Sequence, residues 1–326
     1  MTGSAGRYNC LAHCLNLLVD RFMELSFLAY LRGRCRSLRQ VDVGIGDDAA
    51  VLVPPVGKQI LCTDQIIDGV DFDSAADGFQ WADAGFKAMA VNLSDIAAMG
   101  ATPDAALVTL TLPHTNATQI AGDVYEGIFQ AAQQYRVAIA GGDLSTYNGP
   151  LAISVTLTGY VASGKPWLRS GAKEGDAILV SGAVGGSLLG RHLRPIPRLD
   201  FAAQVRSLAT VHSAIDISDG LSLDLDRLLA ASRVGAELDV DQIPIHDDAI
   251  QRSGQTGTPP FQHAWSDGED FELILTMSQQ DAAAVLRYPG FDCEVTQIGT
   301  VTGRTGLWKR GSGKVERLSP QGYVHS

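Results

Sequence analysis

The sequence contains few of the residues that mark secreted, zinc-binding or membrane-spanning proteins. Its 326 residues include five cysteines, Cys10, Cys14, Cys35, Cys62 and Cys293, with no CxxC motif and no Cys/His pair at zinc spacing. An odd, scattered set is typical of reduced thiols, so we expect a cytoplasmic protein without a disulfide framework. No apolar run approaches the roughly 20 residues that a membrane span needs, which argues against a membrane partner.

Basic residues are also in short supply. Lysine and arginine number 25 against 36 aspartates and glutamates, which gives a formal net charge of -11. A phosphate polymer would have to approach a chain of its own sign, so we expect no nucleic-acid partner. A small phosphorylated ligand that arrives with a divalent cation is compatible with this charge.

The common motifs of phosphate and hydrolase chemistry are missing. No GK dipeptide is followed by Ser or Thr, and HRD, DFG, GxSxG and HExxH do not occur. The chain is therefore neither a P-loop enzyme nor a protein kinase, and it lacks the signatures of serine hydrolases and zinc peptidases.

Apolar periodicity predicts the elements of the first half. Stretches 106–112 and 151–161 alternate apolar residues with Thr or Ser, as strands with one buried face do. Helical spacing fits 81–99 and 118–135, and 137–143 has the form of a short buried strand that ends in glycines. This order predicts an antiparallel or mixed sheet with helices on one side.

A loop rich in Gly, Ser and Lys separates the two halves, and the apolar pattern restarts after it, so we place a boundary near 162–170. We expect an N-terminal domain at 23–162 and a C-terminal domain at 163–326. Residues 1–22 form an extension without a fold of its own, or a start-site artefact, because Met23 opens a fresh helical pattern.

The second half mixes strands and helices. Strands are expected at 177–181, 213–217, 236–240 and 271–277, and helices at about 200–209, at 221–232 (ended by Gly235) and at 279–287. Mixed elements in both halves predict α+β layers in each domain.

Five short acidic motifs lie at the ends of expected elements: GIGDD (44–48), CTD (62–64), NLSD (92–95), GGD (141–143) and DISDG (216–220). A lone aspartate at such a place usually caps a helix or forms a turn. If the fold gathers several of them, their repulsion must be relieved by raised pKa values or by hard cations. Oxygen ligands without His or Cys favour Mg²⁺, Ca²⁺ or Mn²⁺ over zinc, and Mg²⁺ commonly bridges to a substrate phosphate.

Eight segments, in order along the chain, resemble the signature blocks of the thiamine-monophosphate kinases, a family of the PurM-like ATP-binding superfamily. They are GIGDDAAVL (44–52), TDQIIDGVDF (63–72), KAMAVNLSDIAAMGA (87–101), GGDLS (141–145), RSGAKEGD (169–176), RHLRPIPR (191–198), AIDISDGLSLDL (214–225) and DGEDFEL (267–273). The resemblance runs from about residue 43 to 276, and the GY pair at 322–323 matches the family's C-terminal end. NLSDIAAMGA, RSGAK and DISDGL together make a chance match negligible, and NLSDIAAMGA and RHLRP favour the thiamine-monophosphate kinases among related enzymes.

The resemblance implies ATP-dependent, Mg²⁺-assisted phosphorylation of thiamine monophosphate to thiamine diphosphate. It also implies a PurM-like α+β and α/β architecture in two domains, with N-terminal strands that pair across a homodimer. The positions that match family metal ligands are Asp48, Thr63, Asp64, Asp95, Asp143, Asp216 and Asp219. The positions that match ATP contacts are Gly142, Asp143, Arg169 and Ser218, and those that match substrate contacts are Glu269 and Tyr323.

The expected chemistry is direct in-line transfer without a phosphoenzyme. Phosphoryl transfer needs positioned groups and neutralised charge, which carboxylate-held metal and an arginine fork provide, so we expect catalytic roles for Asp143, Arg169 and Asp219. The acceptor phosphate is already largely dianionic at pH 7, so a general base has little to remove. Of Glu269 and Asp270, one is expected to face the substrate while the other caps or pairs.

Four features depart from the family pattern. Cys62 stands where the family often has Ser, which leaves only a backbone oxygen as a hard ligand. Asp71 stands where the family often has His; it either pairs with the thiazolium charge of the substrate or lies in solvent. The loop GGDLSTYNGP (141–150) is longer and lacks a basic residue, and no extra helix separates GGSLLG from RHLRPIPR.

Two other readings remain open at this point. Aminoimidazole ribonucleotide synthetase, selenophosphate synthetase and the hydrogenase-maturation dehydratase share the ATP and Asp/Mg²⁺ chemistry. No glycine-flanked cysteine precedes Gly44, which disfavours selenide chemistry. A non-catalytic protein that binds metal or nucleotide is the alternative from another class.

Overall fold

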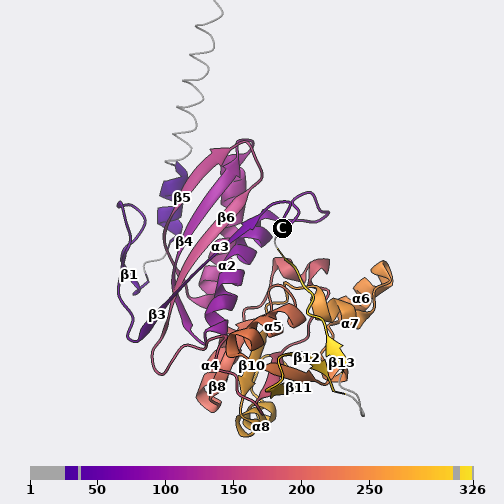
Figure 1. The fold of residues 1–326 in the computed structure, drawn as a ribbon. Helices are drawn as coiled ribbons and strands as arrows, with labels where there is room; N and C mark the ends of the chain where they lie inside the picture. The colour runs from indigo at the N-terminus through magenta and orange to yellow at the C-terminus, as the bar shows by residue number, and fades with distance from the viewer. Residues whose placement is uncertain (1–25, 36–37, 311–315, 325–326) are drawn as a thin grey trace, which may run out of the picture.

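Two β-sheets, one in each half of the chain, organise the structure (Figure 1). This computed structural model describes residues 26–35, 38–310 and 316–324, and the extension expected at 1–22 lies outside these ranges. Residues 26–34 are helical, and a short hairpin of β1 (Val41–Val43) and β2 (Val51–Leu52) follows. Within the described residues, no helix is long and apolar enough to cross a membrane.

The N-terminal sheet is mixed, as the sequence predicts. Its strands, in spatial order, are β3 (Lys58–Ile67), β6 (Ala152–Val161), β4 (Thr102–Pro113) and β5 (Ala138–Tyr147). Neighbours pair antiparallel except β4 and β5, which are parallel because α3 (Ala117–Tyr135) connects them as a crossover. Strand β5 does not end at its glycines as expected, since its pairing with β4 continues to Tyr147.

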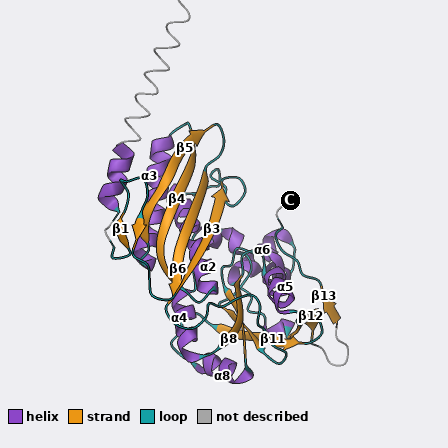
Figure 2. Cartoon of the chain, turned by 60° about the vertical axis from the view of Figure 1, so that its left-hand side comes forward, coloured by secondary structure: helices purple, strands orange, loops and turns teal. Residues whose placement is uncertain are grey.

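One face of this sheet is covered by α3 and by α2 (Trp81–Ala98), as Figure 2 shows. Both helices match the predicted ranges. Helix α2 also contacts the C-terminal domain, so it is buried on almost every side. At Gly127 an added Cβ would lie 1.7 Å from the carbonyl oxygen of Ala82, so glycine permits the close approach of the two helices.

The C-terminal sheet has seven strands. Their spatial order is β13 (Glu316–Leu318), β12 (Gly306–Lys309), β9 (Gly235–Leu238), β11 (Val295–Thr302), β7 (Ala177–Ser181), β10 (Leu273–Met277) and β8 (Val211–Asp216). Its helices are α4 (Leu199–Leu208), α5 (Leu221–Ser232), α6 (Asp247–Thr256), α7 (Pro260–Ser266) and α8 (Gln279–Arg287). Three short 3₁₀ segments are η1 (Ser187–Leu189), η2 (Arg191–Leu193) and η3 (Val240–Gln242).

The predicted strands and helices of this half are confirmed, with one correction at the end of α5. Arg233, in the left-handed region at φ 59°, ends α5, and Gly235 instead begins β9. Helices α6 and α7 and the strands after α8 were not predicted from the sequence.

The outer face of the N-terminal sheet, turned away from α2 and α3, is only partly covered within the described residues, with Leu28 and Arg32 of the helix at 26–34 beside it. Leu61 on β3 and Leu107 on β4 are 68% and 45% exposed there. Leu38, Val41 and Leu52 from the hairpin region pack beside β4 and β5 and cover part of this face. The rest of this face mixes these apolar side chains with polar ones such as Thr63, Thr156 and Asp143.

Candidate functional site

A cavity of about 470 Å³ lies where the two domains meet along α2. Nine of the residues singled out from the sequence line it: Asp64, Asp71, Asp95, Arg169, Asp216, Ser218, Asp219, Glu269 and Tyr323. They come from β3, the loop after it, α2, the segment between β6 and β7, the end of β8, the loop before β10 and the C-terminal tail. The fold therefore brings together segments that are far apart in the chain.

Three carboxylates form the acidic part of the cavity, and each is placed by a different element. Asp64 is on the face of β3 that points to α2, Asp95 is in the last turns of α2, and Asp216 ends β8. Helix α2 packs directly on β8, and the Ser94 hydroxyl donates a hydrogen bond of 2.6 Å to Asp216 Oδ2. Ser94 is fully buried, so this bond fixes Asp216 across the domain boundary.

Burial and mutual repulsion shift these carboxyl groups toward the protonated form. Burial, and then the charges of Asp216 and Asp64, raise the pKa of Asp95 to about 8. Burial likewise raises the pKa of Asp64 and of Asp216, and the hydrogen bond from Ser94 opposes the rise for Asp216. Arg169, which lines the same cavity, lowers the pKa of Asp95 and of Asp216 by its charge. The site therefore favours a cation or a proton.

The donor chemistry fits Mg²⁺ shared with a phosphate ligand. In the described part of the chain, no group of three or more His, Cys, Asp or Glu side chains could hold a metal ion by itself. Mg²⁺ usually keeps several waters, takes one or two carboxylates and completes its shell with substrate phosphate. An all-oxygen set with raised pKa values suits that mode of binding and not a closed metal cage.

Asp219 lies in the turn between β8 and α5 and has two neighbours that the sequence analysis missed. Arg227 donates hydrogen bonds to Asp219 Oδ2 and, at 2.8 Å, to Asp224 Oδ1. Asp224 Oδ2 accepts the backbone N–H groups of Asp219 and Gly220 at the start of α5. The spacing of Asp224 and Arg227 on a helix, three residues apart, is the signal that could have revealed this pair.

Glu269 and Asp270 have different environments. Glu269 lines the cavity, and its Oε1 accepts a hydrogen bond of 2.6 Å from Lys87 Nζ. Asp270 is turned away from it, where it pairs with Arg191 at 3.0 Å and accepts the N–H of Gly185. Sequence reasoning missed Lys87, which lies within a run that otherwise has the pattern of a buried helix face.

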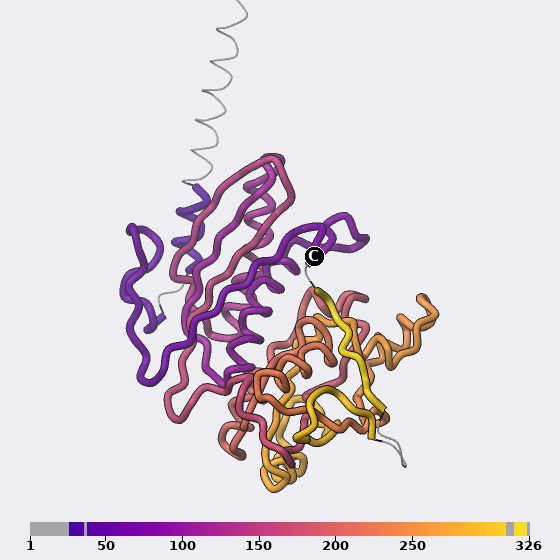
Figure 3. The backbone as a smooth tube through the Cα atoms, in the orientation of Figure 1, coloured from indigo at the N-terminus to yellow at the C-terminus, as the bar shows by residue number. Residues whose placement is uncertain are grey.

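Asp71 and Tyr323 border the cavity from opposite ends of the chain. Asp71 Oδ2 accepts the backbone N–H of Ile67 at 2.7 Å, so its carboxylate closes its own turn. The backbone N–H of Tyr323 donates to the carbonyl of Asp219, and Gln321 bonds to Ser222. These bonds hold the tail along the C-terminal domain, with its end facing the N-terminal domain (Figure 3).

Four of the predicted residues, Asp48, Thr63, Gly142 and Asp143, do not line this cavity. Thr63 and Asp143 lie on the outer face of the N-terminal sheet, and the Thr63 hydroxyl bonds to Val155 O and Thr156 Oγ1. Asp48 and Gly142 line a second cavity, of about 810 Å³, beside that face. Adjacent strand residues point to opposite sides of a sheet, which separates Thr63 from Asp64.

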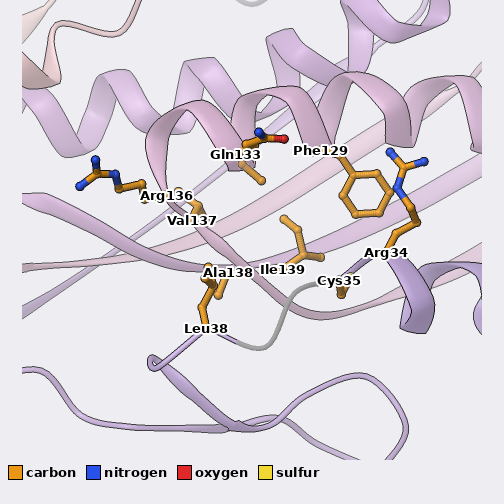
Figure 4. Close-up of a pocket in the computed structure, with 10 residues that line it drawn as sticks. Arg34, Cys35, Leu38, Phe129, Gln133, Arg136, Val137, Ala138 and Ile139 are labelled. Atoms are coloured by element: carbon orange, nitrogen blue, oxygen red, sulfur yellow. The ribbon is translucent and has the colours of Figure 1, made fainter.

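Cys62 points inward, on the same side as Asp64. Its Sγ lies 3.6 Å from the backbone oxygen of Asn92 on α2, and burial raises the pKa of the thiol. A third cavity, of about 440 Å³, lies between Arg34 and the end of α3 (Figure 4). Basic and apolar residues such as Arg136 and Phe129 line it, and it contains none of the predicted site residues.

The family model for AIR synthase related proteins matches the chain in two parts, its N-terminal domain over residues 46–161 and its C-terminal domain over 168–308. The chain therefore belongs to the AIR synthase-related family. It is 60% identical over 312 residues to thiamine-monophosphate kinase of Rhodopirellula baltica, which covers 93% of this chain and 97% of the relative. It is 36% identical over 299 residues to the Salmonella typhimurium enzyme, with coverages of 85% and 87%. Within the wider family, the chain is a member of the thiamine-monophosphate kinases.

Solved structures agree with this placement. Thiamine-monophosphate kinase from Stenotrophomonas maltophilia superposes with a TM-score of 0.75 at 32% identity, covering 88% of this chain and 96% of that one. AaThiL complexed with AMPPCP and TMP gives a TM-score of 0.73 at 29% identity, with coverages of 86% and 92%. The hydrogenase maturation protein HypE of Escherichia coli, at 17% identity and a TM-score of 0.74, shares the fold alone, with coverages of 93% and 98%.

Proposed function

We propose that this protein transfers the terminal phosphoryl group of ATP to thiamine monophosphate and so forms thiamine diphosphate. The observation that carries this is the interdomain cavity, where carboxylates from β3, α2 and β8 lie with Arg169. The chain is 60% identical to the Rhodopirellula baltica kinase, and the structurally similar AaThiL binds AMPPCP and TMP. Both substrates are anionic, which fits a site that combines an arginine with cation-binding carboxylates.

We propose that Mg²⁺ binds at the acidic part of the cavity, held by Asp64, Asp95, Asp216 and Asp219. When bound, it neutralises phosphate charge and offsets the repulsion that raises the carboxyl pKa values. Asp219 has to share its carboxylate with Arg227 or release it when the metal binds. Ser94 keeps Asp216 oriented throughout.

We propose direct in-line transfer, in which the side chains bind and orient and none forms a covalent bond. Arg169 has the planar fork that suits phosphate oxygens, and Ser218 offers a hydroxyl to the nucleotide at the same wall. Asp71, Glu269 and Tyr323 are the proposed contacts to thiamine monophosphate, whose thiazolium cation suits carboxylates and an aromatic face. A labelled protein adduct trapped after ATP alone would contradict this scheme.

We propose a homodimer in which the open outer face of the N-terminal sheet is covered by the same face of a second copy. Leu61 and Leu107 would lose their exposure there, and strands of the two N-terminal domains would pair. The proposed metal and ATP roles of Asp48, Thr63, Gly142 and Asp143 depend on this second copy, because these residues are at or beside the outer face.

The remaining proposals concern location and domain limits. We propose a cytoplasmic protein, because Cys35, Cys62 and Cys293 are free thiols, as a reducing compartment requires. We propose domain limits of 23–162 and 163–326, supported by the family matches over 46–161 and 168–308.

The decisive assay is coupled ADP release with purified protein, ATP and Mg²⁺. We offer thiamine monophosphate, thiamine and the precursor of aminoimidazole ribonucleotide as separate acceptors. Turnover with thiamine monophosphate alone supports the proposal. Turnover with the aminoimidazole precursor would instead favour an aminoimidazole ribonucleotide synthetase. Tight nucleotide binding without turnover on any acceptor would identify a non-catalytic binding protein.

A further inference from the structure

Lys87 is a buried cation at the boundary of the cavity. Its side chain is fully buried within α2, although lysine is rarely found without solvent. Its ammonium donates to the backbone oxygen of Asp71 at 2.5 Å and to Glu269 Oε1 at 2.6 Å. One partner belongs to the N-terminal domain and the other to the C-terminal domain, and both line the cavity. Lys87 therefore connects two walls of the site without forming part of its surface.

Three acids of the loop before β10, Glu269, Asp270 and Glu272, each pair with a different cation. Asp270 pairs with Arg191 and Glu272 with Arg198, and both carboxylates are almost completely buried. Glu269, which pairs with Lys87, keeps 24% of its side chain exposed and faces the cavity. The Lys87–Glu269 pair thus differs from the other two in having a carboxylate that a ligand can reach.

The backbone around Glu269 is constrained. Glu269 and Phe271 adopt φ values of 53° and 54°, in the left-handed region that residues other than glycine seldom occupy. Their N–H groups donate to Ser218 and Ile217, next to β8. Such conformations persist where surrounding contacts determine them, and they concentrate at functional sites. The backbone is therefore fixed at Glu269, whose side chain lines the cavity.

Two groups of acids share the cavity. Burial, and then the charges of Asp216 and Asp64, raise the pKa of Asp95; all three are proposed metal ligands. Burial, and then the charges of Asp71 and of the proposed metal ligand Asp219, raise the pKa of Glu269, whereas Lys87 lowers it. Lys87 therefore contacts and electrostatically stabilises the part of the cavity that contains Asp71 and Glu269.

We propose that Lys87 is a positioning residue for thiamine monophosphate, which holds Glu269 and the loop at 67–72 in place for the cationic ring of the substrate. The inference rests on the proposed function. It predicts that loss of Lys87 weakens the use of thiamine monophosphate more than the use of ATP, because its two partners, Asp71 and Glu269, are proposed contacts to thiamine monophosphate.

The test is a comparison of Michaelis constants for the two substrates in the full-length protein. In Lys87→Met, we expect the KM for thiamine monophosphate to rise by about tenfold to a hundredfold, as for a misplaced substrate contact, with the KM for ATP within about twofold. Lys87→Arg keeps the charge and should restore part of the loss. Lys87→Met and Glu269→Gln should be non-additive, since both break one pair.

A matched control separates positioning from stability. Removing one member of a buried pair leaves an uncompensated charge, so the double variant Lys87→Met/Glu269→Gln is the safer form to fold. Arg198→Met/Glu272→Gln removes a buried pair from the same loop, outside the cavity. We expect it to lower the melting temperature and leave the ratio of the two KM values unchanged. An equal shift of that ratio in this control would overturn the inference, as would equal rises of both KM values in Lys87→Met.

Hydrogen exchange gives a readout that does not depend on the reaction. In ligand-free Lys87→Met, or in the double variant, we expect faster amide exchange in residues 67–72, because the bond to the oxygen of Asp71 is lost. Unchanged exchange there would overturn the positioning role. Should the wild-type protein fail to turn over thiamine monophosphate, the proposed function fails, and the exchange result still decides whether Lys87 holds this loop.

Discussion

Replacement of Asp95 by asparagine tests two effects separately: how much the carboxylate lowers the free energy of unfolding, and how much turnover depends on it. Burial, Asp216 and Asp64 raise the pKa of Asp95 from 3.8 to about 8. An acid with a raised pKa takes up a proton on folding. The stability gained from this proton uptake is therefore fully present below pH 3.8 and is lost as the pH rises through about 8.

The size of the effect follows from the pH interval. Between pH 3.8 and neutrality there are about three pH units, each worth about 1.4 kcal/mol, so Asp95 lowers the free energy of unfolding by up to about 4 kcal/mol at pH 7. Asparagine has no proton to take up and can donate to a neighbouring carboxylate. We therefore expect Asp95→Asn to be more stable than the wild type without metal, while turnover falls by about a hundredfold or more.

The assay is thermal unfolding of both proteins from about pH 5.5 to pH 8.5, with and without Mg²⁺, beside the ADP-release assay. Stabilisation of the wild type by Mg²⁺ should grow with pH, because the ligands must lose their protons first. Asp95→Asn should lose most of this stabilisation, whereas Asp123→Asn, on the exposed side of α3, should behave as the wild type. Equal melting temperatures at every pH, or equal stabilisation by Mg²⁺, would refute the reasoning.

Three further predictions follow from the same structure. Leu61→Glu or Leu107→Glu should turn the proposed dimer into monomers, measured by light scattering on a sizing column; a dimer that persists in both variants contradicts the interface. Ser94→Ala removes the hydrogen bond to Asp216 and should weaken Mg²⁺ binding by about tenfold or more in calorimetry, and an unchanged affinity would count against a role at the metal. Arg169→Lys loses the planar fork and should raise the KM for ATP more than that for thiamine monophosphate, and the opposite order would move Arg169 to the other substrate.

Much of the fold could be predicted because its main elements carry strong local patterns. Helices α2 and α3 and strands β4, β6 and β7 match the expected ranges, since each has a clear period of 3.6 or 2 or a continuous apolar run. Helix α6 was missed because its sequence, DDAIQRSGQT, is largely polar and buries little beyond Ala249. The end of α5 was misplaced because Arg233 takes a conformation that glycine usually provides.

Nine of the candidate site residues predicted from the sequence line one cavity, but their arrangement was not predicted. Alternation along β3 already indicates that Thr63 and Asp64 point to opposite faces, so the sequence held a signal that was not used. Lys87 gave no such signal, because a lysine in an apolar helix pattern looks like a solvent-exposed residue until its partners are known. The contacts that reveal it come from Asp71 and Glu269, which are distant in the chain.

The sequence by itself determined the family, the two α+β halves and the set of candidate carboxylates, because motif spacing and hydrophobic period are properties of neighbouring residues. Only the tertiary structure decided that Asp64, Asp95 and Asp216 share a cavity while Asp143 faces the other side of the sheet. The physical reason is that this grouping depends on how α2 packs between two sheets. The same packing buries Lys87 and raises the pKa of Asp95, effects that depend on solvent exclusion by distant segments.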